Sequence, residues 1–149
     1  MRQVASMSRG KKAYLQYERE LSQAIARLAQ LREELKGAID IDAESYNAVM
    51  KAYKQAKDSA GADGVIDAAL KQATRVPLRV AERAREVMNI VEELKPITNP
   101  NMKSDLTTAN ALARAAIQGA LANVEINLES LKDTAFAAET RKKAAALTS

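Results

Sequence analysis

The chain has 149 residues, with no Cys, no His, no Trp, one Phe, four Tyr and a formal charge of +4. Without Cys or His it cannot form a thiolate nucleophile, an imidazole base, a Ser-His-Asp triad, a Cys/His zinc site or an iron–sulfur cluster. Any catalysis must therefore use carboxylates, amides, hydroxyls, Lys or Arg. Because few aromatic rings are available for base stacking and no RNA-binding signature is present, we expect no nucleic-acid partner.

The composition favours helix throughout. Roughly a fifth of the residues are Ala, against five Gly and three Pro, and no convincing alternating β run is found. We therefore expect an all-α protein, a multi-helix bundle formed by residues 1–149 as one domain. The longest apolar stretches are interrupted, as at Arg114 and Gln118, and no signal peptide is evident. These features predict no membrane segment and a soluble, cytoplasmic protein.

The first long segment predicts a helix from about Lys11 to Lys36. Its apolar residues recur at alternating spacings of three and four, which is typical of a helix packed in bundle or coiled-coil fashion. We call this set the seam: Tyr14, Tyr17, Leu21, Ala24, Leu28, Leu31 and Leu35.

A second amphipathic segment begins near Asp40 and Asp42, either of which can cap its first turn. Gly37 separates this segment from the first helix or kinks a single one. One side of the second segment is predominantly apolar, with Tyr46, Val49, Met50 and Tyr53.

The polar, Gly-containing stretch 57–64 predicts the longest internal loop. Residues 65–95 return to helical periodicity, and Pro77 is expected to kink or split this segment because proline lacks an amide proton and crowds the preceding turn. The stretch 96–103 contains two Pro and two Asn, which predicts a turn-rich connection.

After this connection, Ser104 or Asp105 is expected to begin a long helix that ends near Leu131. Asp133 is placed to cap a last, short helix. The chain has no further repeat at the heptad scale and no low-complexity segment.

Two amides on the long predicted helix are candidates for a functional site. Asn123 and Asn127 form an i, i+4 pair on a face otherwise lined by Ala116 and Ala120. Amides in such a place must find hydrogen-bond partners or cost free energy, which suggests a polar network or a ligand groove. An interhelical register device or simple solvent exposure would explain the same spacing.

Acidic and basic side chains offer a second set of candidates. Taken alone, Asp42 and Asp105 are best explained as helix caps. The functional alternative is that these two carboxylates, from different helices, converge in a cleft. In a cleft, one carboxylate kept partly protonated by the other could exchange a proton with a ligand nitrogen. The compact basic cluster of Arg9, Lys11 and Lys12 could hold an anion or remain solvated.

Five segments spread along the chain are informative when they are taken together. In order they are GKKAY at 10–14, DIDAESYNAVMKAYK at 40–54, VPLRVA at 76–81, NPNMKSD at 99–105 and GALANVEINL at 119–128. Their order and spacing resemble the family of folate enzymes that contains formiminotetrahydrofolate cyclodeaminase domains and methenyltetrahydrofolate cyclohydrolases. The resemblance covers nearly the whole chain.

The resemblance implies an all-helical homodimer that binds a tetrahydrofolate derivative, often polyglutamylated, in a cleft. Cyclodeaminases of this family convert 5-formiminotetrahydrofolate to 5,10-methenyltetrahydrofolate with loss of ammonia. Cyclohydrolases interconvert the methenyl and 10-formyl forms. Neither reaction needs a metal, a thiol or a redox cofactor, so the resemblance implies no metal site and no cofactor beyond the tetrahydrofolate substrate.

The resemblance also assigns residues to the site. Asp42 and Asp105 match the family's acidic positions and are the expected catalytic residues, while Asn123 and Asn127 match its amide pair. Substrate binding is further expected from the basic stretch and from the fourth matched segment, through Lys11, Asn99 and Ser104.

The segments at 7–10 and 103–106 look more like the cyclodeaminase branch, which therefore leads the cyclohydrolase reading narrowly. A noncatalytic alternative is a helical interaction module that uses the seam for oligomerisation, or a folate-binding remnant. Family members usually carry a Gly-rich segment before the helix that 4–8 is expected to finish, and the present sequence is N-terminally short of it.

Overall fold

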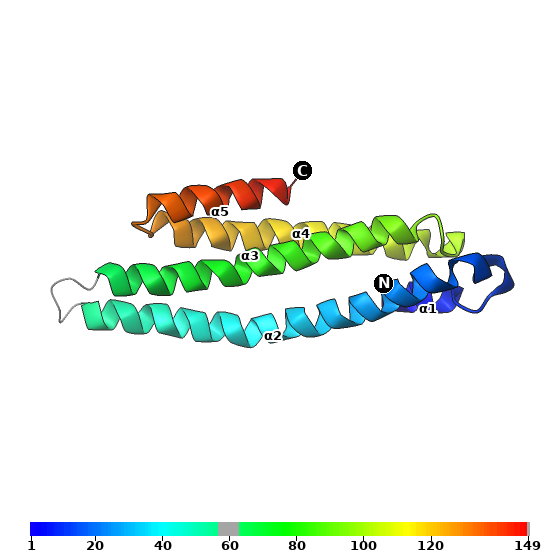
Figure 1. Cartoon of the computed structure of the whole chain (residues 1–149), viewed down its shortest axis with the longest axis horizontal. Helices are drawn as coiled ribbons and strands as arrows, with labels where there is room; N and C mark the ends of the chain where they lie inside the picture. Colours follow the sequence, from blue (N-terminus) through cyan, green and yellow to red (C-terminus); the bar gives the residue numbers. More distant parts are fainter. Residues whose placement is uncertain (57–62, 149) are drawn as a thin grey trace. The chain divides into compact units, whose positions relative to one another are not determined.

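A computed structural model of the chain describes residues 1–56 and 63–148, and all regular elements within these ranges are helical (Figure 1). The all-α prediction is confirmed. The elements in chain order are α1 (Arg2–Ser8), the 3₁₀ helix η1 (Lys12–Tyr17), α2 (Glu18–Ala56), α3 (Asp63–Leu94), the 3₁₀ helix η2 (Pro100–Met102), α4 (Lys103–Glu129) and α5 (Thr134–Ala146).

Helix α2 is a single helix of 39 residues, where a boundary between two helices was one of the expectations. Gly37 lies inside it, because the cost of about 1 kcal/mol for one Gly is small against the propensity and packing of its neighbours. Asp40 and Asp42 therefore lie in mid-helix, and the prediction that either caps a helix is wrong. The helical region begins close to the expected position, but its first part is the 3₁₀ turn η1.

Helix α3 continues through Pro77, so the prediction that proline splits the segment is wrong. Proline removes one helical hydrogen bond, but Pro77 and its neighbours Val76 and Leu78 are buried, and this packing holds the helix together. The expected loop at 57–64 is shorter at its end, because Asp63 and Gly64 already belong to α3. The remaining part of that predicted loop, 57–62, lies outside the described residues.

Helix α4 begins at Lys103, so Ser104 and Asp105 lie within its first turn and not before it. The cap in this region belongs to Asn99, whose side-chain oxygen accepts a hydrogen bond from the backbone N–H of Asn101 at 3.0 Å and starts η2. Asp133 caps α5 as predicted, accepting from the backbone N–H of Phe136 at 3.0 Å.

The chain forms two compact units. Unit 1 comprises Met1–Leu35 and Arg83–Ala116, and unit 2 comprises the described residues of Lys36–Glu82 and Ile117–Ser149. Helices α2, α3 and α4 each contribute one portion to each unit. The expectation of one domain over 1–149 stays a prediction.

The core of unit 1 is built around the seam. Leu21, Leu28 and Leu31 are buried, and Tyr14, Tyr17 and Ala24 pack on the same cluster. Their buried partners come from α1, α3 and α4: Val4, Ala5, Ile90, Val91, Leu94 and Leu106. The prediction of a packed seam is confirmed. Its use as an oligomerisation surface stays a prediction, and Tyr14, Tyr17 and Leu35 are half-buried members of the seam.

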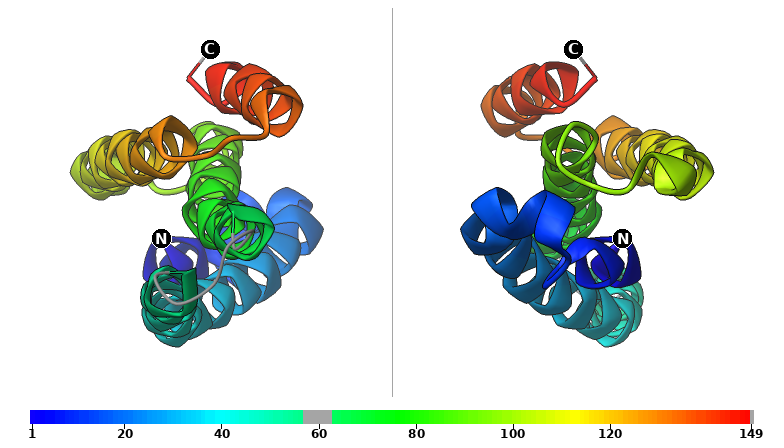
Figure 2. Two further views of the ribbon diagram at one scale, coloured as in Figure 1. Left: turned by 90° about the vertical axis from the view of Figure 1, so that its left-hand side faces the viewer. Right: turned by 90° about the vertical axis from the view of Figure 1, so that its right-hand side faces the viewer.

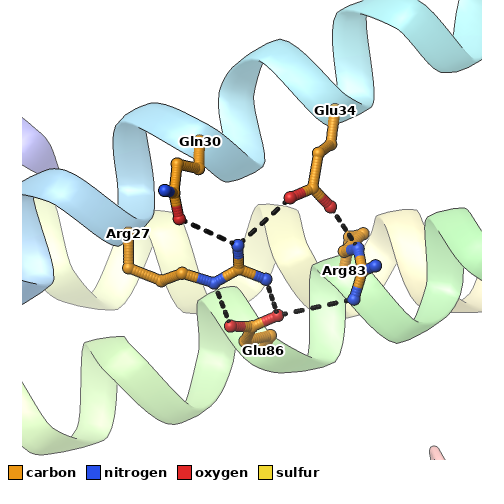
Figure 3. A network of polar contacts seen from close by, with 5 residues as sticks. All are labelled: Arg27, Gln30, Glu34, Arg83 and Glu86. Atoms are coloured by element: carbon orange, nitrogen blue, oxygen red, sulfur yellow. Dashed lines mark hydrogen bonds and ion pairs between the residues drawn. The ribbon is translucent and has the colours of Figure 1, made fainter.

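Charged side chains join α2 and α3 beside this core (Figure 3). Arg27 donates to both carboxylate oxygens of Glu86, at 2.5 and 2.7 Å, and to Glu34 at 3.1 Å. Arg83 makes ion pairs with Glu34 at 2.5 Å and with Glu86 at 3.7 Å. The contact from Arg83 Nε is an ion pair without an aligned hydrogen bond. The hydrogen bond from Arg27 keeps the pKa of Glu86 below its ordinary value.

The core of unit 2 joins α3, α4 and α5. Viewed along the helices (Figure 2, left), α3 lies between α2 and α4. The buried cluster of unit 2 consists of Leu70, Leu78, Val124, Leu128, Leu131 and Ala137. None of the helices in the described part of the chain is long and apolar enough to cross a membrane.

The turn between α4 and α5 is tied to α3 by charge. The carboxylate of Asp67 accepts hydrogen bonds from the backbone N–H groups of Lys132 and Asp133, each at 3.0 Å. Lys71 lies 2.5 Å from Asp133 and 5.7 Å from the ring centroid of Phe136. These contacts set the position at which α4 ends, and α4 supplies one wall of the pocket described next.

Candidate functional site

A pocket of about 390 Å³ lies in unit 2 among α2, α3 and α4. It brings together three of the seven residues predicted for a site, namely Asp42, Asn123 and Asn127. The pocket is lined by Asp42, Ser45, Tyr46, Val49, Tyr53, Leu70, Ala73, Pro77, Asn123, Ile126, Asn127 and Ser130.

Helix α2 presents one continuous face to this pocket. Asp42, Tyr46, Val49 and Tyr53 follow each other at spacings of four, three and four, which places them along one side of a helix. Ser45 is buried on the same side, and its hydroxyl donates to the backbone carbonyl of Asp42 at 2.8 Å. Because Asp42 lies in mid-helix, no backbone N–H at a helix start occupies its carboxylate.

Helix α4 contributes the two predicted amides. Asn123 is exposed and Asn127 half-buried, while Val124 and Leu128 on the other side of the helix are buried in the core. Within the described residues, the side chains of Asn123, Asn127 and Asp42 have no hydrogen-bond or ion-pair partner. The alternative of an interhelical amide network is therefore not what this part of the structure contains.

Helix α3 forms the apolar side of the pocket through Leu70, Ala73 and Pro77, all of which are buried. Because Pro77 has no N–H, the carbonyl of Ala73 lacks the donor that residue i+4 normally supplies. Both residues line the pocket, so the helix backbone itself is short of one donor at this place.

The polar part of the lining carries a single charge. Asp42 is the one ionisable carboxylate among the lining residues, and the amides of Asn123 and Asn127 can both donate and accept. A carboxylate and two amides suit a ligand that presents several N–H groups beside carbonyl or ring-nitrogen acceptors. The carboxylate can also accept a proton from such a ligand or return one.

The other four predicted site residues belong to unit 1. Lys11, Ser104 and Asp105 are exposed, and Asn99 is half-buried. Asn99 lines a different cavity of about 400 Å³. Its backbone N–H donates to Ser8 Oγ at 3.1 Å. The convergence of Asp42 with Asp105 stays a prediction.

Unit 1 also holds a larger cavity, of about 660 Å³, lined in part by Arg27 and Glu86. The charges of these two residues are directed at each other and at Glu34, as Figure 3 shows. The smaller pocket of unit 2 is the better candidate site, because its carboxylate and amides have no partner within the described residues. No group of three potential metal-ligating side chains occurs among the residues described here.

Sequence reasoning missed two aromatic residues of the site. Tyr46 and Tyr53 stand on the side of α2 that was interpreted only as apolar, yet they are 62% and 40% exposed and line the pocket. Tyr46 follows Asp42 by four residues, and Tyr53 follows Tyr46 by seven. These spacings place all three residues on one side of a helix, and this was the signal available in the sequence. It could not be used while Asp42 was interpreted as a cap.

The fold is an all-helical bundle in which three long helices line one small pocket. The sequence profile of the family described as Formiminotransferase-cyclodeaminase matches residues 1–146. The chain belongs to this family, and the resemblance found in the five segments is confirmed.

Relatives match over most of the chain. A methenyltetrahydrofolate cyclohydrolase from Methylorubrum extorquens is 37% identical over 144 residues, which cover 94% of this chain and 69% of the relative. A formimidoyltransferase-cyclodeaminase from Sus scrofa is 28% identical, covering 97% of this chain but 27% of its own length. The crystal structure of formiminotetrahydrofolate cyclodeaminase from Thermotoga maritima superposes with a TM-score of 0.91 at 30% identity, covering 98% of this chain and 71% of that one.

Proposed function

We propose that this protein is an enzyme of folate-dependent one-carbon metabolism, a formiminotetrahydrofolate cyclodeaminase that forms 5,10-methenyltetrahydrofolate and ammonia. The observation that carries the proposal is the match to the Thermotoga maritima cyclodeaminase, which covers 98% of the chain at 30% identity. The unit 2 pocket supports it, because a carboxylate and two amides suit the N–H groups and carbonyl of a pterin ring.

The reaction requires proton transfer at two nitrogens. N10 of the substrate attacks the formimino carbon and loses its proton, the bond from that carbon to the imino nitrogen breaks, and the departing nitrogen gains protons and leaves as ammonia. We assign this proton transfer to Asp42 or Asp105, and we assign to Asn123 and Asn127 the orientation of the pterin or of the one-carbon unit. Lys11, Asn99 and Ser104 complete the proposed substrate contacts.

The experiment that tests the function starts from 5-formiminotetrahydrofolate and the purified chain. Methenyltetrahydrofolate is followed by its near-ultraviolet absorbance, and ammonia is measured in the same samples. Equal amounts of both products support a cyclodeaminase. Folded protein that yields neither product contradicts the proposal.

The roles of the two carboxylates are tested by Asp42→Asn and Asp105→Asn, with Asp40→Asn as the matched control. Loss of a general acid or base lowers kcat by roughly 100-fold or more, whereas Asp40 lies outside the lining of the pocket and should not affect turnover. Wild-type kcat in either test variant removes that residue from the mechanism. Circular dichroism confirms that each variant is folded.

The amide pair is tested in the same way. Asn123→Ala and Asn127→Ala are each expected to raise KM and lower kcat. Each single variant should lose about tenfold in kcat/KM, because it removes a polar contact worth roughly 1.5 kcal/mol. Asn47→Ala is the control, since Asn47 is exposed on α2 and does not line the pocket. Equal effects at all three positions would indicate a general loss of stability and not a contact with substrate.

Methenyltetrahydrofolate cyclohydrolase is the second candidate function, favoured by the 37% identity to the Methylorubrum extorquens enzyme. 5,10-Methenyltetrahydrofolate is the product of the cyclodeaminase reaction and the substrate of the cyclohydrolase reaction. If the cyclohydrolase assignment holds, the protein should accelerate the hydrolysis of 5,10-methenyltetrahydrofolate to 10-formyltetrahydrofolate above the spontaneous rate. Comparison of kcat/KM for this substrate and for the formimino substrate decides between them.

The proposal includes a homodimer, a polyglutamylated form of the substrate, no cofactor beyond tetrahydrofolate, and a cytoplasmic location. Sedimentation equilibrium measures the oligomeric state, and a monomer mass at all concentrations would contradict the dimer. Turnover that survives dialysis against EDTA supports the absence of a metal cofactor. A lower KM for pentaglutamyl than for monoglutamyl substrate supports polyglutamate binding. Cell fractionation tests the proposed cytoplasmic location.

A further inference from the structure

Two tyrosines of the unit 2 pocket do not belong to its buried core. Tyr46 is 62% exposed and Tyr53 is 40% exposed, although both line the pocket. Within the described residues, neither hydroxyl has a hydrogen-bond partner, and neither ring belongs to the buried cluster of unit 2. Seven residues separate them on one helix, so both rings lie on one side of α2 about 10 Å apart along its axis.

The pocket is elongated and its two ends differ. In Figure 1, α2 and α4 run in the same direction and α3 runs in the opposite one. The contacts of α3 with α2 and with the turn after α4 require the same antiparallel course. Of the lining residues, Asp42, Asn123 and Pro77 therefore lie toward one end, and Tyr53, Leu70 and Ser130 toward the other. The face of α2 from Asp42 to Tyr53 spans eleven residues, or about 16 Å.

Charge also differs between the ends. The lining carries its single carboxylate, that of Asp42, at one end. The lining at the other end, with Val49, Tyr53 and Leu70, carries no charged side chain. A ligand with N–H donors at one tip is therefore attracted with that tip toward Asp42.

We propose that Tyr46 and Tyr53 form an aromatic platform that binds the aminobenzoyl ring of the tetrahydrofolate substrate. The pterin ring then lies toward Asp42 and Asn123, and the rest of the substrate extends past Tyr53. This inference rests on the proposed function. It adds that the ring contacts of α2 fix the orientation of the substrate in the pocket, with stacking as the physical contact.

The test measures dissociation constants of tetrahydrofolate for the wild type, Tyr46→Leu, Tyr53→Leu and Tyr53→Phe by equilibrium dialysis under anaerobic conditions. Each Leu variant is expected to bind about tenfold more weakly, because leucine keeps an apolar side chain but loses the stacking ring. Tyr53→Phe keeps the ring and should bind within about twofold of the wild type. Met50→Leu is the matched control, since Met50 is 46% exposed on α2 and does not line the pocket.

Two fragments of the ligand locate the contact. p-Aminobenzoylglutamate, used as a competitor, should lose affinity for the Leu variants in parallel with tetrahydrofolate. 6-Methyltetrahydropterin, which has no aminobenzoyl ring, should compete equally against all variants. An equal loss for both fragments places the tyrosines at the pterin and overturns the proposed orientation.

The remaining outcomes separate the inference from the function on which it rests. Wild-type protein that binds and turns over folate, with Leu variants that bind it unchanged, overturns the aromatic platform and leaves the enzyme assignment intact. Wild-type protein that neither binds nor turns over folate contradicts the proposed function itself. Because both tyrosines are exposed, the variants should fold, and urea midpoints within about 0.3 M of the wild type verify this.

Discussion

Leu31 and Leu112 offer the same chemical change at two extremes of burial within unit 1. Leu31 is 1% exposed in the core cluster, whereas Leu112 on α4 is 66% exposed. Truncation of Leu31 to Ala removes three carbon groups from the core, or about 2.4 kcal/mol of transfer free energy at about 0.8 kcal/mol each. The cavity that remains adds to this, so Leu31→Ala should lower the free energy of unfolding by about 3–4 kcal/mol.

Leu112→Ala should cost less than about 1 kcal/mol, because only a third of its side chain leaves water on folding. Urea unfolding followed by circular dichroism measures both variants. With an m-value of about 2 kcal/mol/M, the midpoint should fall by about 1.5–2 M for Leu31→Ala and by less than about 0.5 M for Leu112→Ala.

Equal losses for the two variants would refute the reasoning in one of two ways. If the loss at Leu112 shrinks on dilution of the protein, the side chain is buried against another chain, and its exposure in the single chain is the wrong measure. If the loss is independent of protein concentration, the packing of unit 1 differs from the structure described above.

Three further changes test the polar contacts. Asp67→Ala removes the acceptor for two backbone N–H groups after α4 and should lower the free energy of unfolding by about 1–3 kcal/mol, measured as a urea midpoint. The pKa of Glu86 is depressed by its hydrogen bond with Arg27, so the unfolded state takes up this proton at higher pH than the folded state. The stabilisation is therefore complete above the ordinary pKa of 4.5 and is lost as the pH falls through the lower pKa of the folded state. The difference in free energy of unfolding between wild type and Glu86→Gln should narrow on acidification from pH 7 to pH 4. Thr74→Val should cost less than about 1 kcal/mol in urea, because Thr74 is fully buried and its hydroxyl donates only to a carbonyl of its own helix, that of Leu70; a larger loss would mean that this bond holds the helix near the pocket.

The helical fold followed from local information, and so did the packing of the first helix. The seam from Tyr14 to Leu31 repeats at three and four residues, and this period by itself identifies the buried face. At Gly37 and Pro77 the sequence left a break or a kink as alternatives, and the structure excludes the break at both. Both residues lie inside long helices whose neighbours are held by tertiary packing, which a local propensity cannot include.

The pairings between helices could not be derived in this way. Arg27 and Glu86 are 59 residues apart. Arg27 is the only charged residue of 21–31, and Glu86 ends the mixed-charge run 82–86, which is equally typical of a solvated face. Their fork of two hydrogen bonds depends on the register of α2 against α3. Nothing in either segment alone specifies that register.

The site illustrates the same limit, with a consequence for function. Asp42 and the Asn123–Asn127 pair were each identified from the sequence, but each had a structural explanation as a cap or as a register device. The structure removes the explanation for Asp42 by continuing α2 through it, and it places the carboxylate beside the amides in one pocket. Asp42 and Asn123 are exposed and, like Asn127, have no partner among the described residues, so they contribute little to folding, and their meeting in one pocket is the geometry on which the proposed function rests.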